Sequence, residues 1–238
     1  LSKKMNGDFI IQTKINFIGN GHEPHRKTGI MIRGSNSANA AMVACTVHGD
    51  GLLALQYRKK EGDDVEEIKF ETNGAEFIQL EKRGTTYTMS VAKFGEPFTT
   101  KKIENIDLGN DLLSGLFVCS HNNNFVEEVA FTNTRIFTTA ADNLVQYKEY
   151  LGSLLEVLDV ETSEREVLAK SNDSWQAPNW TADGKTLIYN ADGKLYTFDL
   201  ASRTSKELFT DFAVKNNNDH VLTFDGTQIG ISHHSKED

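Results

Sequence analysis

The sequence predicts an all-β protein, in which an antiparallel β-sandwich is followed by small repeated sheets. From residue 7 to residue 137, short apolar stretches recur between Gly, Asn and Asp turns, and no stretch of useful length has the 3.6-residue apolar period of an amphipathic helix. Further along, residues 179–208 contain two short strands joined by Asp-Gly turns, at Asp183-Gly184 and Asp192-Gly193. Asp-Gly is typical of tight hairpins, so this second region is predicted to be a β-meander.

Composition limits the function classes. The chain has 238 residues and a net charge of −9. An acidic chain without a clustered basic region argues against nucleic acid or an anionic membrane surface as partner. No apolar run reaches the roughly 20 residues of a membrane-spanning helix. The cysteines, Cys45 and Cys119, have no metal-ligand spacing, and we expect two buried free thiols, with a bridge between neighbouring strands as the alternative.

The first region contains ten candidate strands, enough for two stacked sheets or a closed barrel. They span 9–17, 27–33, 41–48, 52–59, 66–70, 75–83, 86–92, 101–106, 112–120 and 126–137. Side chains alternate between the two faces of a strand, so Arg33 is predicted to lie opposite Ile32, and Gln56 and Arg58 opposite Tyr57. Several strands therefore present a polar side chain near one end of a face.

The order of these segments resembles a bacterial concanavalin-like (laminin-G-like) jelly-roll domain. The resemblance covers about residues 1–137 and is carried by KTGIMIR at 27–33, LEKRG at 80–84 and GLFVCSH at 115–121. It implies two curved antiparallel sheets, of which the concave one often carries a carbohydrate-binding groove.

Five side chains are candidates for binding a glycan on that concave face: Arg33, His48, Gln56, Arg58 and His121. The alternative is structural, because the two arginines could pair with carboxylates on a solvated sheet and His121 could be an ordinary surface residue. A glycosidase on this fold needs two carboxylates on one face. Glu127 and Glu128 are adjacent and would point to opposite faces, so catalysis by this domain is disfavoured.

The second region contains an internal repeat. Residues 153–160 match residues 193–200 at an offset of 40, and residues 179–189 match 221–231 at an offset of 42. A period of about 40 to 45 residues is that of a four-stranded propeller blade. We place a sandwich at residues 1–140, a linker at 141–152 and about two blades at 153–238, with Trp180 in the core of a blade.

The motif WTADGKTLIY, followed by KLYTFDL, resembles the repeat of TolB-like (WD40-like) β-propellers. Propellers have four to eight blades, so we expect the sequence to be a fragment of a longer parent chain. A related lyase type of propeller uses channel histidines to bind a divalent metal. That resemblance implies His220, His233 and His234 as candidate metal ligands here.

The leading functional hypothesis is a bacterial cell-envelope protein, periplasmic or secreted after loss of a signal peptide, that recognises or processes a carbohydrate polymer. Two alternatives are open. One is a non-catalytic scaffold that binds envelope proteins, as TolB-type propellers do. The other is a lyase or hydrolase whose active site lies in the propeller channel and is incomplete in this sequence.

Overall fold

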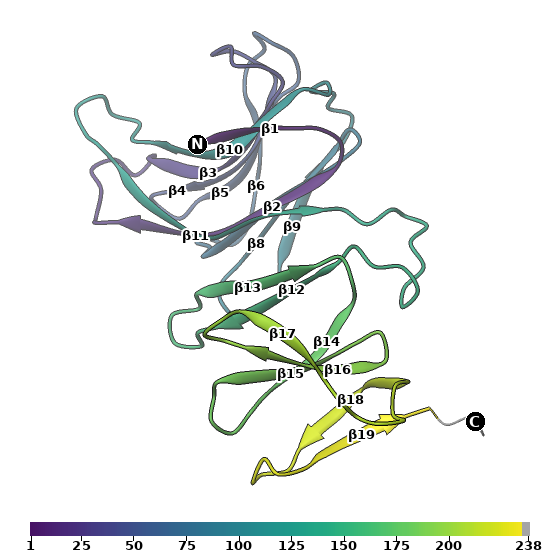
Figure 1. Ribbon diagram of the computed structural model, residues 1–238. Coiled ribbons are helices and arrows are strands. Elements are labelled where there is room, and N and C mark those ends of the chain that lie inside the picture. Colours follow the sequence, from purple (N-terminus) through teal and green to yellow (C-terminus); the bar gives the residue numbers. More distant parts are fainter. Residues whose placement is uncertain (235–238) are drawn as a thin grey trace. The chain divides into compact units, whose positions relative to one another are not determined.

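The computed structural model describes residues 1–234, and it contains nineteen β-strands and, within that range, no helix (Figure 1). The predicted all-β class is confirmed. The chain forms two compact units, Leu1–Thr139 and Ala140–Asp238, called unit 1 and unit 2 below. Among the described residues there is no helix that is long and apolar enough to cross a membrane.

Unit 1 is a sandwich of two antiparallel sheets (Figure 1). The six-stranded sheet has the order β1 (Ser2–Met5), β10 (Leu112–Cys119), β3 (Lys27–Arg33), β4 (Met42–His48), β5 (Leu53–Arg58) and β6 (Glu66–Lys69). The five-stranded sheet has the order β11 (Glu128–Thr138), β2 (Phe9–Ile18), β7 (Phe77–Arg83), β8 (Thr86–Ala92) and β9 (Thr99–Ile103). Both sheets pair strands that are distant in sequence, such as β10 with β3 and β11 with β2, as jelly-roll topologies require.

One hydrophobic core lies between the two sheets. The six-stranded sheet supplies Ile30, Ile32 and Leu55, and the five-stranded sheet supplies Ile78 and Leu80, all of them fully buried. These residues alternate with more exposed ones along each strand, which is the period-two pattern that predicted the strands. Each such side chain contributes about 1.5–3 kcal/mol through burial.

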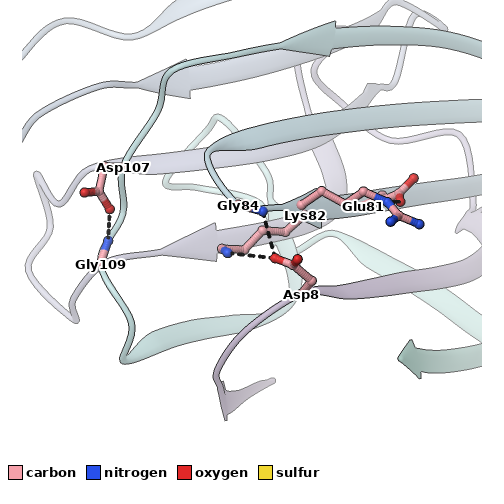
Figure 2. Close-up of polar contacts among 7 residues, drawn as sticks. Asp8, Glu81, Lys82, Gly84, Asp107 and Gly109 are labelled. Carbon is pink, nitrogen blue, oxygen red and sulfur yellow. Dashed lines mark hydrogen bonds and ion pairs between the residues drawn. The ribbon is translucent and has the colours of Figure 1, made fainter. Parts of the chain in front are cut away.

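A carboxylate connects strand β2 with the β7–β8 turn (Figure 2). Asp8 Oδ1 accepts a hydrogen bond from the Gly84 backbone N–H at 2.8 Å and lies 3.4 Å from Lys82 Nζ. Lys82 is buried on the core side of β7, so its apolar stem packs inside while its ammonium group reaches Asp8 at the end of the sandwich. Beside it, burial raises the pKa of Tyr87, and Asp107 and Asp8 raise it further. The contacts of Asp8 thus join the start of β2 to the β7–β8 turn at one end of the five-stranded sheet.

Unit 2 contains three antiparallel sheets of two, four and two strands. The first is β12 (Ser153–Leu158) with β13 (Arg165–Ser171). The second is β14 (Trp175–Trp180), β15 (Thr186–Ala191), β16 (Lys194–Asp199) and β17 (Thr204–Leu208), paired in chain order. The third is β18 (Asn216–Leu222) with β19 (Ile229–His233).

The repeat seen in the sequence recurs in the turn geometry. Thr181 N donates to Thr186 O at 2.9 Å, and its hydroxyl lies 2.6 Å from Asp183 Oδ1. At the equivalent turn, Thr223 N donates to Gln228 O at 3.0 Å and its hydroxyl lies 2.5 Å from Asp225 Oδ1. The two turns therefore have the same internal hydrogen bonds, 42 residues apart.

The Asp192-Gly193 turn is a two-residue hairpin, as predicted. Ala191 pairs with Lys194, and φ is +48° at Asp192 and +72° at Gly193. Positive φ at both central residues defines the type I′ turn, which is why Asp-Gly is favoured there.

Two detailed expectations are wrong. Trp180 is 51% exposed, because it is the last residue of β14 at the edge of its sheet, and the ring in the core is that of Trp175, which lies 4.7 Å from the Tyr189 ring. Both cysteines are free, but only Cys45 is buried, and Cys119 is exposed at the end of β10. Burial raises the pKa of the Cys45 thiol.

Candidate functional site

Four of the five predicted ligand-binding side chains, those of Arg33, His48, Gln56 and Arg58, share one face of the six-stranded sheet. Their sequence neighbours Ile32, Val47, Leu55 and Tyr57 belong to the core cluster on the other side of the sheet. The cross-strand register agrees, since Arg33 pairs with Met42, and Met42 pairs with Arg58. We call this side, which points away from the core, the outer face.

The register arranges the outer face in rows across the strands. One end row contains Leu113, Arg33, Met42 and Arg58, and the opposite end row contains Cys119, Lys27 and His48. Between them lie small residues, including Ala44, Thr46 and Ala54, which are buried among their neighbours. Lys27 and Arg33 are six residues apart on β3, so the end rows are separated by about 20 Å at 3.3–3.4 Å per residue.

The two arginines are held by backbone carbonyls. Arg58 donates from Nε to Asp63 O at 2.8 Å and from Nη1 to Ala40 O at 3.1 Å, and Arg33 Nη2 donates to Ser37 O. Arg33 Nε is buried without a partner. Within residues 1–234 neither guanidinium forms an ion pair. The pairing with carboxylates that the structural alternative required is therefore not seen in this range.

Gln56 lies between the two end rows. It accepts a hydrogen bond from Thr46 Oγ1 at 3.3 Å and donates to Glu67 Oε2 at 3.1 Å. That hydrogen bond lowers the pKa of Glu67, and Lys69, whose Nζ lies 3.0 Å from Glu67 Oε1, lowers it further. The negative charge of Glu67 is thus balanced by Lys69, and Gln56 donates a hydrogen bond to it.

The fifth predicted residue, His121, lies beyond the end of β10 with φ of +60°. Its ring is 6.0 Å from that of His25, and the His25 ring is 6.3 Å from that of His48. We call His25, His48 and His121 the histidine cluster. His25 is not predicted by the sequence, because it lies in a loop before β3, where no strand alternation indicates which way it points.

Arg26 and Glu127 join the loops that carry the cluster. Arg26 Nη1 lies 2.7 Å from Glu127 Oε2, with side-chain exposures of 7% and 3%. The guanidinium also stacks 4.5 Å over the Phe17 ring. Glycine at position 21, where φ is +65°, makes room for it, since a Cβ there would lie 2.0 Å from Arg26 Nη1. This buried pair joins the loop before β3, which contains His25, to the loop before β11, which contains His121.

The His48 ring is buried, and neither ring nitrogen has a hydrogen-bond partner among the described residues. Burial lowers the pKa of His48 below its ordinary value, and Lys27 lowers it further, while Asp50 and Glu67 act in the opposite direction. At neutral pH the ring is therefore uncharged. A neutral imidazole has one hydrogen-bond donor and one acceptor, and in His48 both are unused within the described residues.

The lowered pKa of His48 predicts how the stability of unit 1 depends on pH. Below an ordinary histidine pKa of about 6.5, the unfolded chain takes up the proton first, so the free energy of unfolding should fall as the pH drops towards the lowered value. Urea unfolding followed by far-UV circular dichroism at pH 7.5, 6 and 5 measures this fall. In His48→Asn the free energy of unfolding should fall less with pH than in the wild type. In the control His234→Asn it should fall as much as in the wild type. Equal falls in all three would contradict the assignment.

The three candidate metal ligands lie at different places in unit 2. His220 is buried in β18 with Nε2 3.2 Å from Ile188 O, and a carbonyl oxygen only accepts, so Nε2 carries the proton. The His233 ring makes an edge contact with Phe212 at 5.8 Å, and His234 follows β19. In residues 1–234 there is no group of three or more His, Cys, Asp or Glu side chains that could hold a metal ion. The metal site stays a prediction without support from the described geometry.

Unit 2 also contains a cavity of about 930 Å³, lined in part by Trp175, Tyr189, Tyr196 and Glu207. The Tyr189 and Tyr196 rings stack at 5.4 Å, and the Tyr189 hydroxyl lies 3.0 Å from Ser205 Oγ. The aromatic residues are shared with the hydrophobic cluster of this unit. The aromatic side chains that line part of this cavity thus also pack in the core of unit 2.

Comparison with known proteins gives limited information about function. No family model matches the chain. An uncharacterized protein of Agrobacterium fabrum is 38% identical over 81 residues, which are 34% of this chain and 28% of that protein. The match therefore spans less than a third of the length of this relative.

Similar solved structures include a functionally unknown protein from Saccharomyces cerevisiae, with 13% identity and a TM-score of 0.44 over 59% of this chain and 75% of that one. An alginate lyase from Klebsiella pneumoniae has 10% identity and a TM-score of 0.42 over 57% and 61% of the two chains. A carbohydrate-binding module from Bacillus subtilis has 12% identity and a TM-score of 0.37 over 58% and 78%. At such TM-scores, function has to be argued from the site itself.

Proposed function

We propose that the outer face of unit 1 binds a carbohydrate polymer, in the periplasm or outside a bacterial cell. The observation that carries the proposal is the set of buried polar atoms without partners on this face, namely both ring nitrogens of His48 and Nε of Arg33. Buried polar groups are normally satisfied, and sugar hydroxyl groups both donate and accept hydrogen bonds. The distance of about 20 Å between the end rows suits a polymer better than a monosaccharide.

The proposed role is recognition, with no hydrolysis by unit 1. Hydrolysis by the usual mechanism requires two carboxylates flanking the scissile bond. On the strands of the outer face, Glu67 is the only carboxylate by register, and it is already bound to Gln56 and Lys69. Glu127, whose side chain is buried in the loop before β11, is paired with Arg26.

For unit 2 we propose two half blades and one full blade of a β-propeller. Sheets of two, four and two strands, with identical turns 42 residues apart, support this proposal. The repeat aligns β12 with β16, and β16 is paired on both sides whereas β12 is paired only with β13 in the described chain.

Binding to a panel of immobilised bacterial and plant polysaccharides tests the proposed function. We expect retention of the full chain on at least one polymer and a loss of about tenfold or more in affinity for His48→Leu, because one hydrogen-bonding ring is removed at nearly constant volume. His22→Leu is the matched control, since the His22 ring stacks on Phe125 and is absent from the rows of the outer face. Failure of the full chain to bind any polymer would overturn the proposal and favour the protein-binding scaffold.

A further inference from the structure

We propose that the outer face selects anionic polysaccharides, carboxylated or sulfated, and binds them at two basic ends about 20 Å apart. This inference rests on the proposed carbohydrate binding by the same face. It adds the charge class of the polymer and the minimum length that engages both ends.

The first argument is charge segregation. By register, the strands of the outer face carry five basic side chains and one carboxylate, although the whole chain has 34 acidic and 25 basic residues. The basic residues are Lys4, Lys27, Arg33, Arg58 and Lys69, and the carboxylate is Glu67. Lys69 and Glu67 compensate each other at 3.0 Å. Four positive charges therefore remain on one face of an acidic protein, which favours an anionic partner.

The second argument is that these charges are uncompensated and that the two arginines among them are held in place. Arg33 and Arg58 are oriented by neutral carbonyl oxygens, so their full charge is kept. Lys27 and Lys4 form no ion pair within the described residues. A preorganised guanidinium fork is the preferred partner of carboxylate and of similar oxyanions.

The third argument is the scarcity of aromatic side chains. Neutral sugars offer mainly hydroxyl groups and apolar ring faces, and the latter need an aromatic platform to pack on. On the strands of the outer face, the register places one aromatic ring besides that of His48, the ring of Phe117. Recognition here therefore depends on charge and hydrogen bonds more than on stacking.

The two ends differ in chemistry. At one end Arg33 and Arg58 flank Met42. The loop after β5, next to this end, contains the acidic residues Glu61, Asp63 and Asp64. At the other end Lys27 lies beside the histidine cluster, with Asp50 and Glu23 in the neighbouring loops.

Three polymers with the same backbone test the inference: dextran, carboxymethyl-dextran and dextran sulfate. We expect the full chain to bind one or both charged polymers at least tenfold more tightly than dextran, with affinity falling between 50 mM and 500 mM NaCl. The comparison of carboxymethyl-dextran with dextran sulfate identifies the acidic group. Preference for dextran or another neutral polymer would overturn the inference and leave carbohydrate binding intact, whereas no binding to any polymer would overturn both.

Variants separate the outer face from the overall charge. Arg58→Gln should weaken binding to the charged polymer about tenfold. Lys27→Gln tests the other end, and it removes no side-chain hydrogen bond formed within residues 1–234. Arg83→Gln is the matched control, because it removes the same charge from the five-stranded sheet, where Arg83 contacts Glu81. Equal weakening by Arg83→Gln and the outer-face variants would show non-specific attraction and contradict the site.

A length series of oligouronates tests the distance between the ends. Affinity should rise steeply until the oligomer spans about 20 Å and then level off. In Lys27→Gln this rise should be reduced to a small fraction of its wild-type value. A monosaccharide uronate that binds as tightly as the longest oligomer would contradict the two-ended site.

Discussion

Replacing Glu127 with alanine is expected to lower the free energy of unfolding of unit 1 by about 3–5 kcal/mol. The variant leaves the Arg26 guanidinium buried, with Gly19 O at 3.4 Å as its remaining hydrogen-bond acceptor and the Phe17 ring beneath it. Leaving one charge buried without its partner lowers the free energy of unfolding by more than the intact pair raises it, because water cannot reach and solvate that charge. The loss is therefore expected to be large although a single ion pair is removed.

The two units can be observed separately in this experiment. Both tryptophans, Trp175 and Trp180, belong to unit 2, so tryptophan emission reports that unit alone. In urea, far-UV circular dichroism should show the unit 1 transition shifted to lower denaturant in Glu127→Ala, and the emission transition should stay in place. Glu104→Ala is the control, because its pair with Lys102 is solvent-exposed and should leave both transitions unchanged. An unshifted unit 1 transition would contradict the role given to the pair.

Loss of this pair should also affect the outer face. Arg26 and Glu127 join the loops before β3 and before β11, and those loops carry His25 and His121. A glycan that uses the histidine cluster should therefore bind more weakly to Glu127→Ala, even without urea, where unit 1 is still folded. Glu127 is thus a positioning residue for the proposed site.

The strands and their faces were predictable because alternation is a local property. Arg33, Gln56 and Arg58 were placed on one side from the apolar neighbours Ile32 and Tyr57, and the register agrees. The Asp192-Gly193 turn of unit 2 was predictable for a similar reason, since positive φ at both residues restricts the residue types.

Contacts between distant segments were not predictable. Arg26 and Glu127 are 101 positions apart, and neither lies in a strand. Nothing in the local sequence indicates that they meet, or that His25 approaches His48. The acceptors of Arg33 and Arg58 are backbone carbonyls, and every residue type provides such a carbonyl, so the sequence carries no signal for them. The exposure of Cys119 likewise depends on where β10 ends.

Gly29→Ala is expected to destabilise unit 1 by about 3 kcal/mol or more, the upper part of the range for overpacking. Gly29 lies in the middle of β3, paired with Thr46 of β4 and Phe117 of β10. A Cβ at this position would lie 1.8 Å from the main-chain oxygen of Cys45. A backbone atom inside a paired sheet cannot rotate away as a side chain can, so the strands themselves must separate.

Urea unfolding followed by far-UV circular dichroism measures this loss, with Gly84→Ala as the control. Gly84 has a positive φ of +53°, but a Cβ there would meet no atom within 4 Å, so its replacement carries only a backbone cost of about 1–2 kcal/mol. Gly29 also has a positive φ, +158°, so the difference between the two variants reports the contact with Cys45 O together with the backbone cost at that φ. If Gly29→Ala were no more destabilising than Gly84→Ala, β3 and β4 would have to be less closely paired at this row.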